Sequence, residues 1–323
     1  MNVPHSLWSI ILSGGQGERM CPLVYRCFEQ GRPKQYCRFC GPKSMLEQTI
    51  ERALDLVEPD RLITVIGSGH RGFLGSRVPG RVLEQPEMRG TAVGVFWPLV
   101  RVLNADPDAT VLVLPSDHYF YPRAALLSQL EAACQLAKEH SQKAILVGAI
   151  PDAPETDYGW IEPVARSASH DHAVRYFEVS SFHEKPSQTL ATRWFEDGYL
   201  WNTMITIGRA ETLWKMGREV LPDVVRTLEE VGFGKGPRAG ILSCEDPWRR
   251  VYEKLPNRDF SRDFLAQVAP RSLVMPLDGV FWSDWGRPER LYQSLNRMRE
   301  AYPEWIDSPD CARLEQVWNR WAS

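Results

Sequence analysis

The sequence predicts an α/β fold with a doubly wound, mostly parallel sheet. Short apolar runs alternate with amphipathic stretches over the first 150 residues, which is the pattern of strands and helices in such folds. The first apolar run, at residues 8–13, ends on two glycines, as expected for a buried parallel strand that enters a glycine turn. The length of 323 residues allows one enlarged α/β domain or two small ones.

The elements of the first half follow from hydrophobic periodicity. Strands are expected at the apolar runs, residues 8–13, 62–66, 110–114 and 144–149. Helices are expected at the amphipathic stretches, residues 44–57, 91–103 and 123–140. Ser44 is a suitable N-cap for the first of these helices, and Glu47 completes a capping box with it.

The alternation changes after Pro151. Residues 159–164 and 173–179 predict two strands around a polar turn, which is the pattern of a hairpin. Further strands are expected at residues 201–207, 273–276 and 279–282, and helical regions from residue 209 and from residue 288. The polar stretch 230–238 contains three glycines and is the best candidate for a mobile excursion.

Composition excludes several classes of protein. A 43% apolar share is enough for a sizeable core. The 38 basic and 41 acidic residues give a net charge of −3, which offers no basic surface for nucleic acid. No apolar run is long enough to cross a membrane, and the first fifteen residues lack the pattern of a secretory signal. We therefore expect a cytoplasmic protein without a nucleic-acid or membrane partner.

Cysteine and histidine give only weak metal signals. The odd number of cysteines, seven, does not suggest a disulfide framework. Cys37 and Cys40 form a CxxC, but a zinc site normally needs a second pair, so free thiols in or near the core are the favoured interpretation. His170 and His172 lie in a polar turn, where a solvated loop is favoured over a metal site.

Residues 12–19 carry the strongest local signal. The run Leu-Ser-Gly-Gly-Gln-Gly-Glu-Arg follows the first predicted strand. Without a Cβ, glycine lets backbone N–H groups approach phosphate oxygens, and Arg19 can form a bidentate contact with a phosphate. The spacing matches neither the Walker loop nor the dinucleotide fingerprint. Taken alone, this segment could also be a structural turn.

A second basic segment follows. In the run Gly-Arg-Pro-Lys-Gln-Tyr at residues 31–36, Pro33 stiffens the backbone that presents Lys34. A solvated basic loop is the alternative.

These segments, with others in the same order along the chain, resemble the signature of the sugar-1-phosphate nucleotidyltransferases. The Lys-Gln pair at residues 34–35 is most similar to the mannose-1-phosphate guanylyltransferase branch. The matching motifs cover nearly the whole chain and lie at residues 14–19, 22–23, 32–34, 84–92, 114–118, 158–161, 182–186, 201–202 and 282–286. Several motifs in one order are far more specific than a glycine loop alone.

The resemblance implies a Rossmann-like, nucleotide-diphospho-sugar transferase fold with a sugar-side strand insertion. It also implies transfer of a nucleoside monophosphate from a nucleoside triphosphate, with GTP favoured, to a sugar 1-phosphate, with mannose 1-phosphate favoured. Because the motifs extend from residue 14 to residue 286, we expect one domain at residues 1–300. Residues 301–323 then form a C-terminal helix that packs on this domain or at a subunit contact. Both a monomer and a homo-oligomer are compatible with the sequence.

The resemblance also implies roles for individual residues. Arg19 is assigned to the triphosphate, Lys34 to phosphate positioning and Lys185 to the sugar phosphate. Asp117 and Asp284 are expected to hold Mg²⁺, which favours few carboxylates plus phosphate oxygens. The expected nucleotide-binding residues are Leu12, Gly14, Gly15, Gly17, Glu84, Arg89, Gly90 and Thr91, and the expected sugar-binding residues are Gly159, Glu184 and Asn202.

Two aspartates have structural alternatives. Asp117 could cap the helix that begins near Pro122, and Asp284 could stabilise a tight turn before Gly286. His118 is expected to orient or pack, because a phosphate nucleophile that is already ionised needs no imidazole base.

Two residues depart from the family pattern. Met204 lies where the family often has glycine, and Trp285 where a small aliphatic residue is commoner. Two alternatives therefore stay open: an enzyme for another hexose 1-phosphate or triphosphate, and a nucleotide-sugar-binding regulator without turnover.

Overall fold

A computed structural model describes residues 6–28, 31–75, 78–165, 168–171, 174–232 and 247–323. Its strands are β1 (Leu7–Ser13), β2 (Leu62–Ile66), β3 (Arg81–Glu84), β4 (Thr110–Pro115), β5 (Tyr119–Tyr121), β6 (Ala144–Ala149), β7 (Gly159–Pro163), β8 (Ser169–Asp171), β9 (Val174–Glu184), β10 (Leu200–Arg209), β11 (Ser272–Leu277) and β12 (Phe281–Ser283). Its helices are α1 (Cys21–Phe28), α2 (Met45–Leu54), α3 (Gly90–Ala105), α4 (Arg123–Glu139), α5 (Gln188–Glu196), α6 (Ala210–Val220), α7 (Pro222–Gly232), α8 (Pro247–Lys254), α9 (Ala266–Val268), α10 (Pro288–Ala301) and α11 (Pro309–Ala322).

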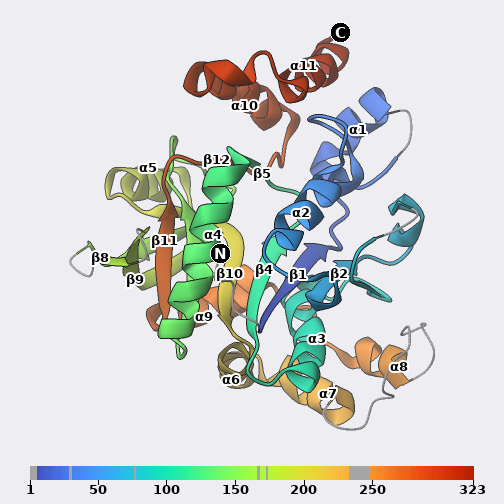
Figure 1. Ribbon diagram of the computed structural model, residues 1–323, viewed down its shortest axis with the longest axis vertical. Helices are drawn as coiled ribbons and strands as arrows, with labels where there is room; N and C mark the ends of the chain where they lie inside the picture. Colours follow the sequence, from blue (N-terminus) through green and yellow to red (C-terminus); the bar gives the residue numbers. More distant parts are fainter. Residues whose placement is uncertain (1–5, 29–30, 76–77, 166–167, 172–173, 233–246) are drawn as a thin grey trace.

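A ten-stranded sheet runs through the middle of the molecule (Figure 1). Its strands lie in the order β3-β2-β1-β4-β10-β6-β11-β9-β7, and β8 pairs with β9. The short strands β5 and β12 pair with each other in a separate two-stranded sheet. This small sheet matters for the site, because Asp117 directly precedes His118 and β5, and Asp284 directly follows β12.

The first half of the large sheet is parallel. β1 pairs in parallel with β2 and β4, and β2 with β3. Neighbouring β1 residues point to opposite faces, so Ile10 joins a core with α3, α6 and α7, whereas Ile11 joins a core with α2 and α4. Helices thus cover both faces, and both cores are built on continuous apolar strands.

The second half corrects the prediction of a mostly parallel sheet. β10 lies antiparallel to β4 and β6, and β9 lies antiparallel to β7 and β11, although β6 and β11 are parallel. The sheet is therefore mixed. The regular alternation of strands and helices on which the prediction rested stops near residue 150. Among the described residues, β7, β8 and β9 then follow one another without an intervening helix, so β7 and β9 can pair antiparallel.

Many individual elements agree with the sequence analysis. The strands predicted at 62–66 and 144–149 have these bounds, and the predicted hairpin corresponds to the antiparallel pair β7 and β9. The capping box is confirmed: the Glu47 backbone N–H donates to Ser44 Oγ at 3.2 Å, and the Ser44 N–H to Glu47 Oε2 at 2.7 Å. β3 and β5 were not predicted, because both are too short for a periodic pattern. Most of the stretch 230–238 lies outside the described residues.

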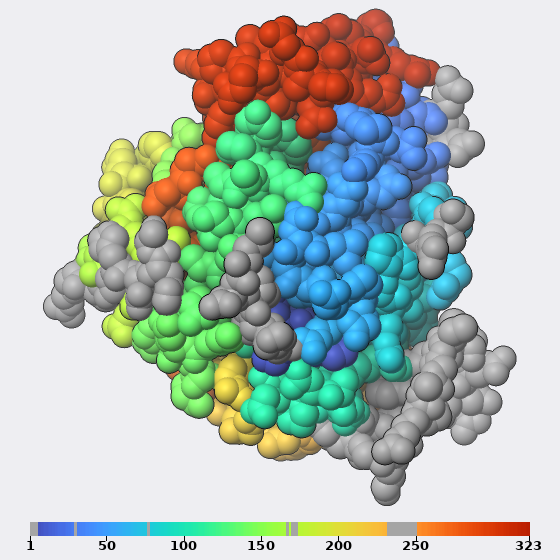
Figure 2. Space-filling model, viewed as in Figure 1, coloured from blue at the N-terminus to red at the C-terminus, as the bar shows by residue number. Residues whose placement is uncertain are grey.

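The C-terminal helices lie at one end of the molecule. α10 and α11, red in Figures 1 and 2, lie next to the N-terminal segments, and α11 contacts α1. A third core joins them, in which Leu23 of α1, Leu295 of α10 and Leu314 of α11 are almost fully buried. This core includes Cys37 and Cys40, whose thiols are free and buried.

Candidate active site

A cavity of about 690 Å³ opens beside the carboxyl ends of β1 and β4, the edge at which open α/β sheets bind ligands. Fourteen of the residues named from the sequence line it: Leu12, Gly14, Gly15, Gly17, Arg19, Lys34, Gly90, Thr91, Asp117, Gly159, Glu184, Lys185, Asn202 and Asp284. The folded chain therefore brings residues from distant motifs to one place.

Two residues expected at the nucleotide lie outside the lining of this cavity. The Glu84 carboxylate accepts hydrogen bonds from the Gly69 N–H at 2.9 Å and from Arg71 Nε at 3.2 Å. The Arg89 guanidinium pairs with Glu87 and donates to the Glu253 carbonyl. Both side chains thus have partners away from the cavity, and their expected roles stay predictions.

The glycine loop is held by the segment around Lys34. Gln35 donates from its side-chain amide to the carbonyls of Ser13, at 3.1 Å, and Gly15, at 2.8 Å. Gly17 has a φ of +65°, and a Cβ there would lie 3.1 Å from the Lys34 backbone nitrogen. Both the left-handed backbone and this close approach favour glycine at this position. From the sequence, Gln35 carried only the resemblance of the Lys-Gln pair and no structural role, because these contacts form only in the fold.

Lys34 lies between the two aspartates. Its side chain is buried, and Nζ lies 3.0 Å from Asp117 Oδ2 and also donates to the Asp284 backbone carbonyl. Burial raises the pKa of Asp117, but the charge and hydrogen bond of Lys34 together with His118 outweigh burial and hold this pKa below its usual value. Asp117 does not cap α4, whose N-cap is Pro122 without a side-chain hydrogen bond.

Asp284 is fixed through one of its two oxygens. Oδ1 accepts hydrogen bonds from Tyr158 OH at 2.9 Å, the Gly286 N–H at 2.9 Å and Arg290 Nη1 at 2.6 Å. The contact with Gly286 is the tight turn proposed as the structural alternative. Burial opposes ionisation, yet Lys34 and Arg290 hold the pKa of Asp284 well below its usual range.

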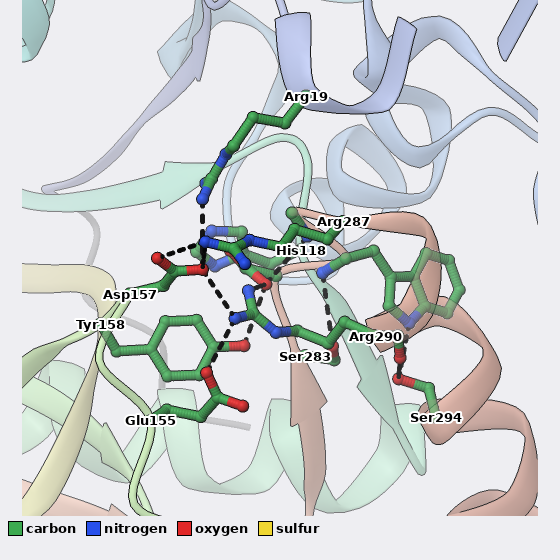
Figure 3. Close-up of polar contacts among 12 residues, drawn as sticks. Arg19, His118, Glu155, Asp157, Tyr158, Ser283, Arg287, Arg290 and Ser294 are labelled. Atoms are coloured by element: carbon green, nitrogen blue, oxygen red, sulfur yellow. Dashed lines mark hydrogen bonds and ion pairs between the residues drawn. The ribbon is translucent and has the colours of Figure 1, made fainter. Parts of the chain in front are cut away.

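An ion-pair network surrounds Arg290 and Asp157 (Figure 3). Asp157 lies 3.3 Å from Arg19, 2.8 Å from Arg287 and 3.2 Å from Arg290. Arg290 also reaches Glu155 at 3.0 Å, and its guanidinium lies 4.5 Å from the centre of the Tyr158 ring. Arg290 thereby connects Asp284 to the start of β7. We did not predict Asp157 or Arg290 from the sequence, because neither belongs to a recognisable motif.

His118 packs beside the aspartates. Its Nδ1 accepts a hydrogen bond from the Trp282 indole N–H at 3.2 Å. Burial lowers its pKa, although Asp117 opposes this shift. These contacts orient the imidazole between β5 and β12 and favour its neutral form.

The opposite wall of the cavity combines polar groups with a thioether. Asn202 Nδ2 donates to Ser261 Oγ at 3.2 Å, and Ser261 Oγ lies 2.9 Å from Met204 Sδ. A Cβ on Gly159 would lie 2.7 Å from Glu184 Oε2, so glycine leaves room for this carboxylate. Burial, together with the nearby charge of Asp259, raises the pKa of Glu184 to about 7.

The three described residues other than glycine with positive φ all lie at or beside this cavity. They are Lys185, Met204 and Trp285, with φ of 50°, 64° and 41°. Left-handed backbone is costly for residues with a Cβ and is often found at functional sites. It also gives a physical reason why a glycine suits the position of Met204.

The structure gives no support to a metal site of the zinc type. The described residues contain no cluster of three or more His, Cys, Asp or Glu side chains that could hold a metal ion. Burial raises the pKa of Cys37 to about 12 and that of Cys40 well above its usual value, so these thiols stay protonated near neutral pH. The His170 and His172 turn lies partly outside the described residues.

The fold and the cavity suit a protein that binds phosphate-bearing ligands, and comparison with known proteins names its family. Residues 8–300 match the Nucleotidyl transferase family, so the chain belongs to it. This family acts on nucleoside triphosphates and sugar phosphates and generally uses a divalent metal ion.

Individual relatives are similar over most of this chain. The alginate biosynthesis protein AlgA of Pseudomonas fluorescens is 32% identical over 289 residues, which cover 86% of this chain and 56% of AlgA. Mannose-1-phosphate guanylyltransferase of Escherichia coli K12 is 26% identical, over 89% of this chain and 59% of that protein. The chain thus spans less than two thirds of these relatives.

A solved structure supports the fold assignment. The mannose-1-phosphate geranyltransferase of Thermus thermophilus superposes with a TM-score of 0.73 at 26% identity, over 89% of this chain and 78% of that one. The predicted resemblance to sugar-1-phosphate nucleotidyltransferases is confirmed. The part of the chain that the structure describes contains no helix long and apolar enough to cross a membrane.

Proposed function

We propose that this protein transfers a nucleoside monophosphate from a nucleoside triphosphate to a sugar 1-phosphate, with release of pyrophosphate. One observation carries the proposal. A single cavity has the glycine loop, Arg19 and Lys34 on one side, Lys185 and Glu184 on the other, and two carboxylates of strongly retained charge nearby. Such a cavity suits two phosphate-bearing substrates that must meet.

The reaction places charge where the cations lie. A phosphate oxygen of the sugar 1-phosphate attacks the α-phosphorus, the bond from this phosphorus to the bridging oxygen breaks, and pyrophosphate leaves with that electron pair. Since the second pKa of a phosphate is about 6, the nucleophile is ionised near neutral pH and needs no general base. Alignment and charge neutralisation are therefore the main tasks of the protein.

The cations and the loop divide this work. The backbone N–H groups of Gly14, Gly15 and Gly17 hold phosphate oxygens, and Arg19 neutralises the triphosphate. Arg19 is half exposed and pairs with Asp157 at 3.3 Å, so an exposed ion pair of small energy is exchanged for a phosphate contact. Lys34 positions the reacting phosphate, and Lys185 binds the phosphate of the sugar.

Asp117 and Asp284 would hold the Mg²⁺ ion. Their chemistry fits: both carboxylates line the cavity, and Asp284 Oδ2 accepts none of the hydrogen bonds found among the described residues. Magnesium takes few carboxylates together with phosphate oxygens. When bound, this ion supplies positive charge to the phosphate oxygens. Lys34, Arg290 and the Tyr158 hydroxyl keep the carboxylates ionised and oriented.

Mannose 1-phosphate and GTP are the favoured substrates. Support comes from the names of the relatives and from the Lys-Gln pair at residues 34–35. Gly159, Glu184 and Asn202 would contact the sugar, and Gly90 with Thr91 the base. The sulfur of Met204, held by Ser261, narrows the sugar side of the cavity, which keeps another hexose 1-phosphate as the second candidate.

The test is a pyrophosphate-release assay of the full chain with four nucleoside triphosphates against several sugar 1-phosphates. We expect turnover that needs Mg²⁺ and is highest for GTP with mannose 1-phosphate. Highest turnover with another pair would change the substrates but not the reaction. No pyrophosphate release with any pair, together with tight binding of a nucleotide sugar, would indicate a regulator rather than an enzyme.

A further inference from the structure

A second cavity lies beside the small sheet. It has a volume of about 270 Å³ and is formed by α2, the segment before it, β5 and the first turn of α11. Its lining contains three basic and two acidic side chains: Lys43, Arg52, Arg123, Glu51 and Asp310. No role in nucleotidyl transfer requires this cavity.

Arg52 is the unusual member of this lining. The residue is only 6% exposed. Its guanidinium donates to Thr49 Oγ1 at 2.6 Å and lies 5.4 Å from the centre of the Phe120 ring. Among the described residues, no carboxylate pairs with it.

An arginine buried in this way is costly unless its charge and its remaining donors are satisfied. Burial, together with the charge of Arg123, lowers the pKa of Arg52 to about 10. The guanidinium is therefore still charged at neutral pH, but the protein stabilises that charge poorly. A Thr hydroxyl satisfies one donor of five.

The other charges of the lining do not supply the missing partner. Glu51 pairs with Lys43 and lies 3.5 Å from Arg123, which also pairs with Asp55. Asp310 lies close to Gly41 and forms no ion pair with Arg52 among the described residues, and burial raises its pKa. The carboxylate nearest to Arg52 along the chain is thus shared by two other cations.

We propose that this cavity binds a small oxyanion, phosphate or a carboxylate, with the Arg52 guanidinium as its main ligand. A guanidinium forms parallel hydrogen bonds to two oxygens of such an anion. Lys43 and Arg123 are about half exposed, so they lie at the rim and attract the anion. Asp310 opposes binding and limits the affinity.

The position of this site gives it a route to the first cavity. Phe120, below the Arg52 guanidinium, is in register with Trp282 across the small sheet. Asp117 lies before β5, and Asp284 follows β12. An anion bound at Arg52 would therefore stabilise the sheet that carries both aspartates.

Hydrogen exchange of the full chain, read peptide by peptide, tests this site. The probes are inorganic phosphate and citrate, with sodium chloride at equal ionic strength as control. We expect slower exchange in peptides that cover residues 45–54 and 119–123. The proposed function implies that phosphate also binds in the first cavity. The Arg19→Ala variant should then lose protection at the glycine loop while it keeps protection at these two peptides.

Variants of the lining sharpen the test. Arg52→Met should raise the anion concentration needed for half-maximal protection at least tenfold. Arg209→Met, which removes an exposed partner of Asp108, should leave this concentration unchanged. Asp310→Asn should strengthen binding several-fold. Protection by phosphate alone or by citrate alone identifies the class of anion.

Two results would overturn the site. One is protection of the unaltered chain by neither anion at residues 45–54 and 119–123, which needs no variant to be folded. The other is a combination of two findings. The Arg52→Lys variant, which keeps the charge but loses the two parallel guanidinium donors, binds the anion as tightly as the unaltered chain, and Asp310→Asn does not change anion binding.

Discussion

The two halves of the large sheet meet the same cavity in different ways. The parallel half, β3-β2-β1-β4, presents a glycine loop whose backbone faces the cavity. The mixed half presents side chains, among them Glu184, Lys185 and Asn202, from β9, the turn after it and β10. Two of the three described non-glycine residues with positive φ, Lys185 and Met204, also lie there.

This difference suggests a division of labour. Backbone N–H groups bind phosphate whatever its substituent, which suits the part of a substrate that all relatives share. Side chains with individual shapes and charges discriminate between ligands. On this view the parallel half is general and the mixed half is selective. Asp117 and Asp284 belong to neither half, because they flank the separate sheet of β5 and β12.

The largest effect is expected at these two aspartates. Asp117→Asn and Asp284→Asn should each lower magnesium-dependent pyrophosphate release by roughly 100- to 1,000-fold, because each removes a charged ligand of one shared ion. The assay is steady-state turnover, with thermal unfolding to check the fold. Near-normal turnover in either variant would show that the two aspartates do not hold one shared metal ion.

The second-largest effect is expected from substitution of Arg290, because Arg290 binds and orients Asp284 from outside the lining of the cavity. Arg290→Met should weaken Mn²⁺ binding by about 10- to 100-fold, as expected when the hydrogen-bond partner of a metal ligand is removed. Calorimetric titration with Mn²⁺ measures this without turnover. Arg290→Lys should recover part of the affinity.

The matched control is Arg297→Met on the same helix. Arg297 pairs with Asp152 and is partly exposed, so its loss should leave Mn²⁺ binding unchanged. Equal weakening in both variants would mean that α10 matters only for stability and that Arg290 does not orient Asp284.

The sequence predicted the parallel half better than the mixed half. β2 was predicted with its observed bounds and β4 to within one residue, because burial on both faces leaves an unbroken apolar run. β10 has partners on both sides and an irregular register near Asn202. No local pattern encodes which neighbour such a strand selects, so its antiparallel pairing could not be read from periodicity.

The same limit applies to the candidate site. Arg19, Lys34, Asp117 and Asp284 lie in motifs and were named in advance. Asp157 and Arg290 are separated by 133 residues and meet only in the fold. Their charges look like ordinary surface charges in the sequence. The charge network around Asp284 therefore became visible only from the structure.

Acid should act on Asp117 and Glu184 in opposite directions. The folded protein lowers the pKa of Asp117, so this group stabilises the fold less as the pH falls. It raises the pKa of Glu184 from 4.5 to about 7, so the contribution of Glu184 is complete below pH 4.5 and is lost as the pH rises through 7. Glu184→Gln should therefore differ little from the unaltered protein at pH 5 and be about 2 kcal/mol more stable at pH 8.

Urea unfolding at the two pH values measures this difference in the free energy of unfolding. The expected size allows for the partial exposure of Glu184. A variant that gains equally at both pH values would show that the gain is unrelated to ionisation. A gain at pH 5 alone would reverse the sign and contradict the proposed effect of burial on this carboxyl.

The smallest effect is expected at Met204, where the mixed half has a backbone strain absent from the glycine loop. With a φ of 64°, Met204→Gly should be more stable than Met204→Ala by about 1 kcal/mol, because alanine keeps the strain and glycine removes it. Comparing these two variants cancels the loss of the contact with Ser261. Urea unfolding at one pH measures the difference. If alanine proved equal to glycine or better, the left-handed backbone would not be strained, and the preference for glycine at this position would have to come from space for the sugar.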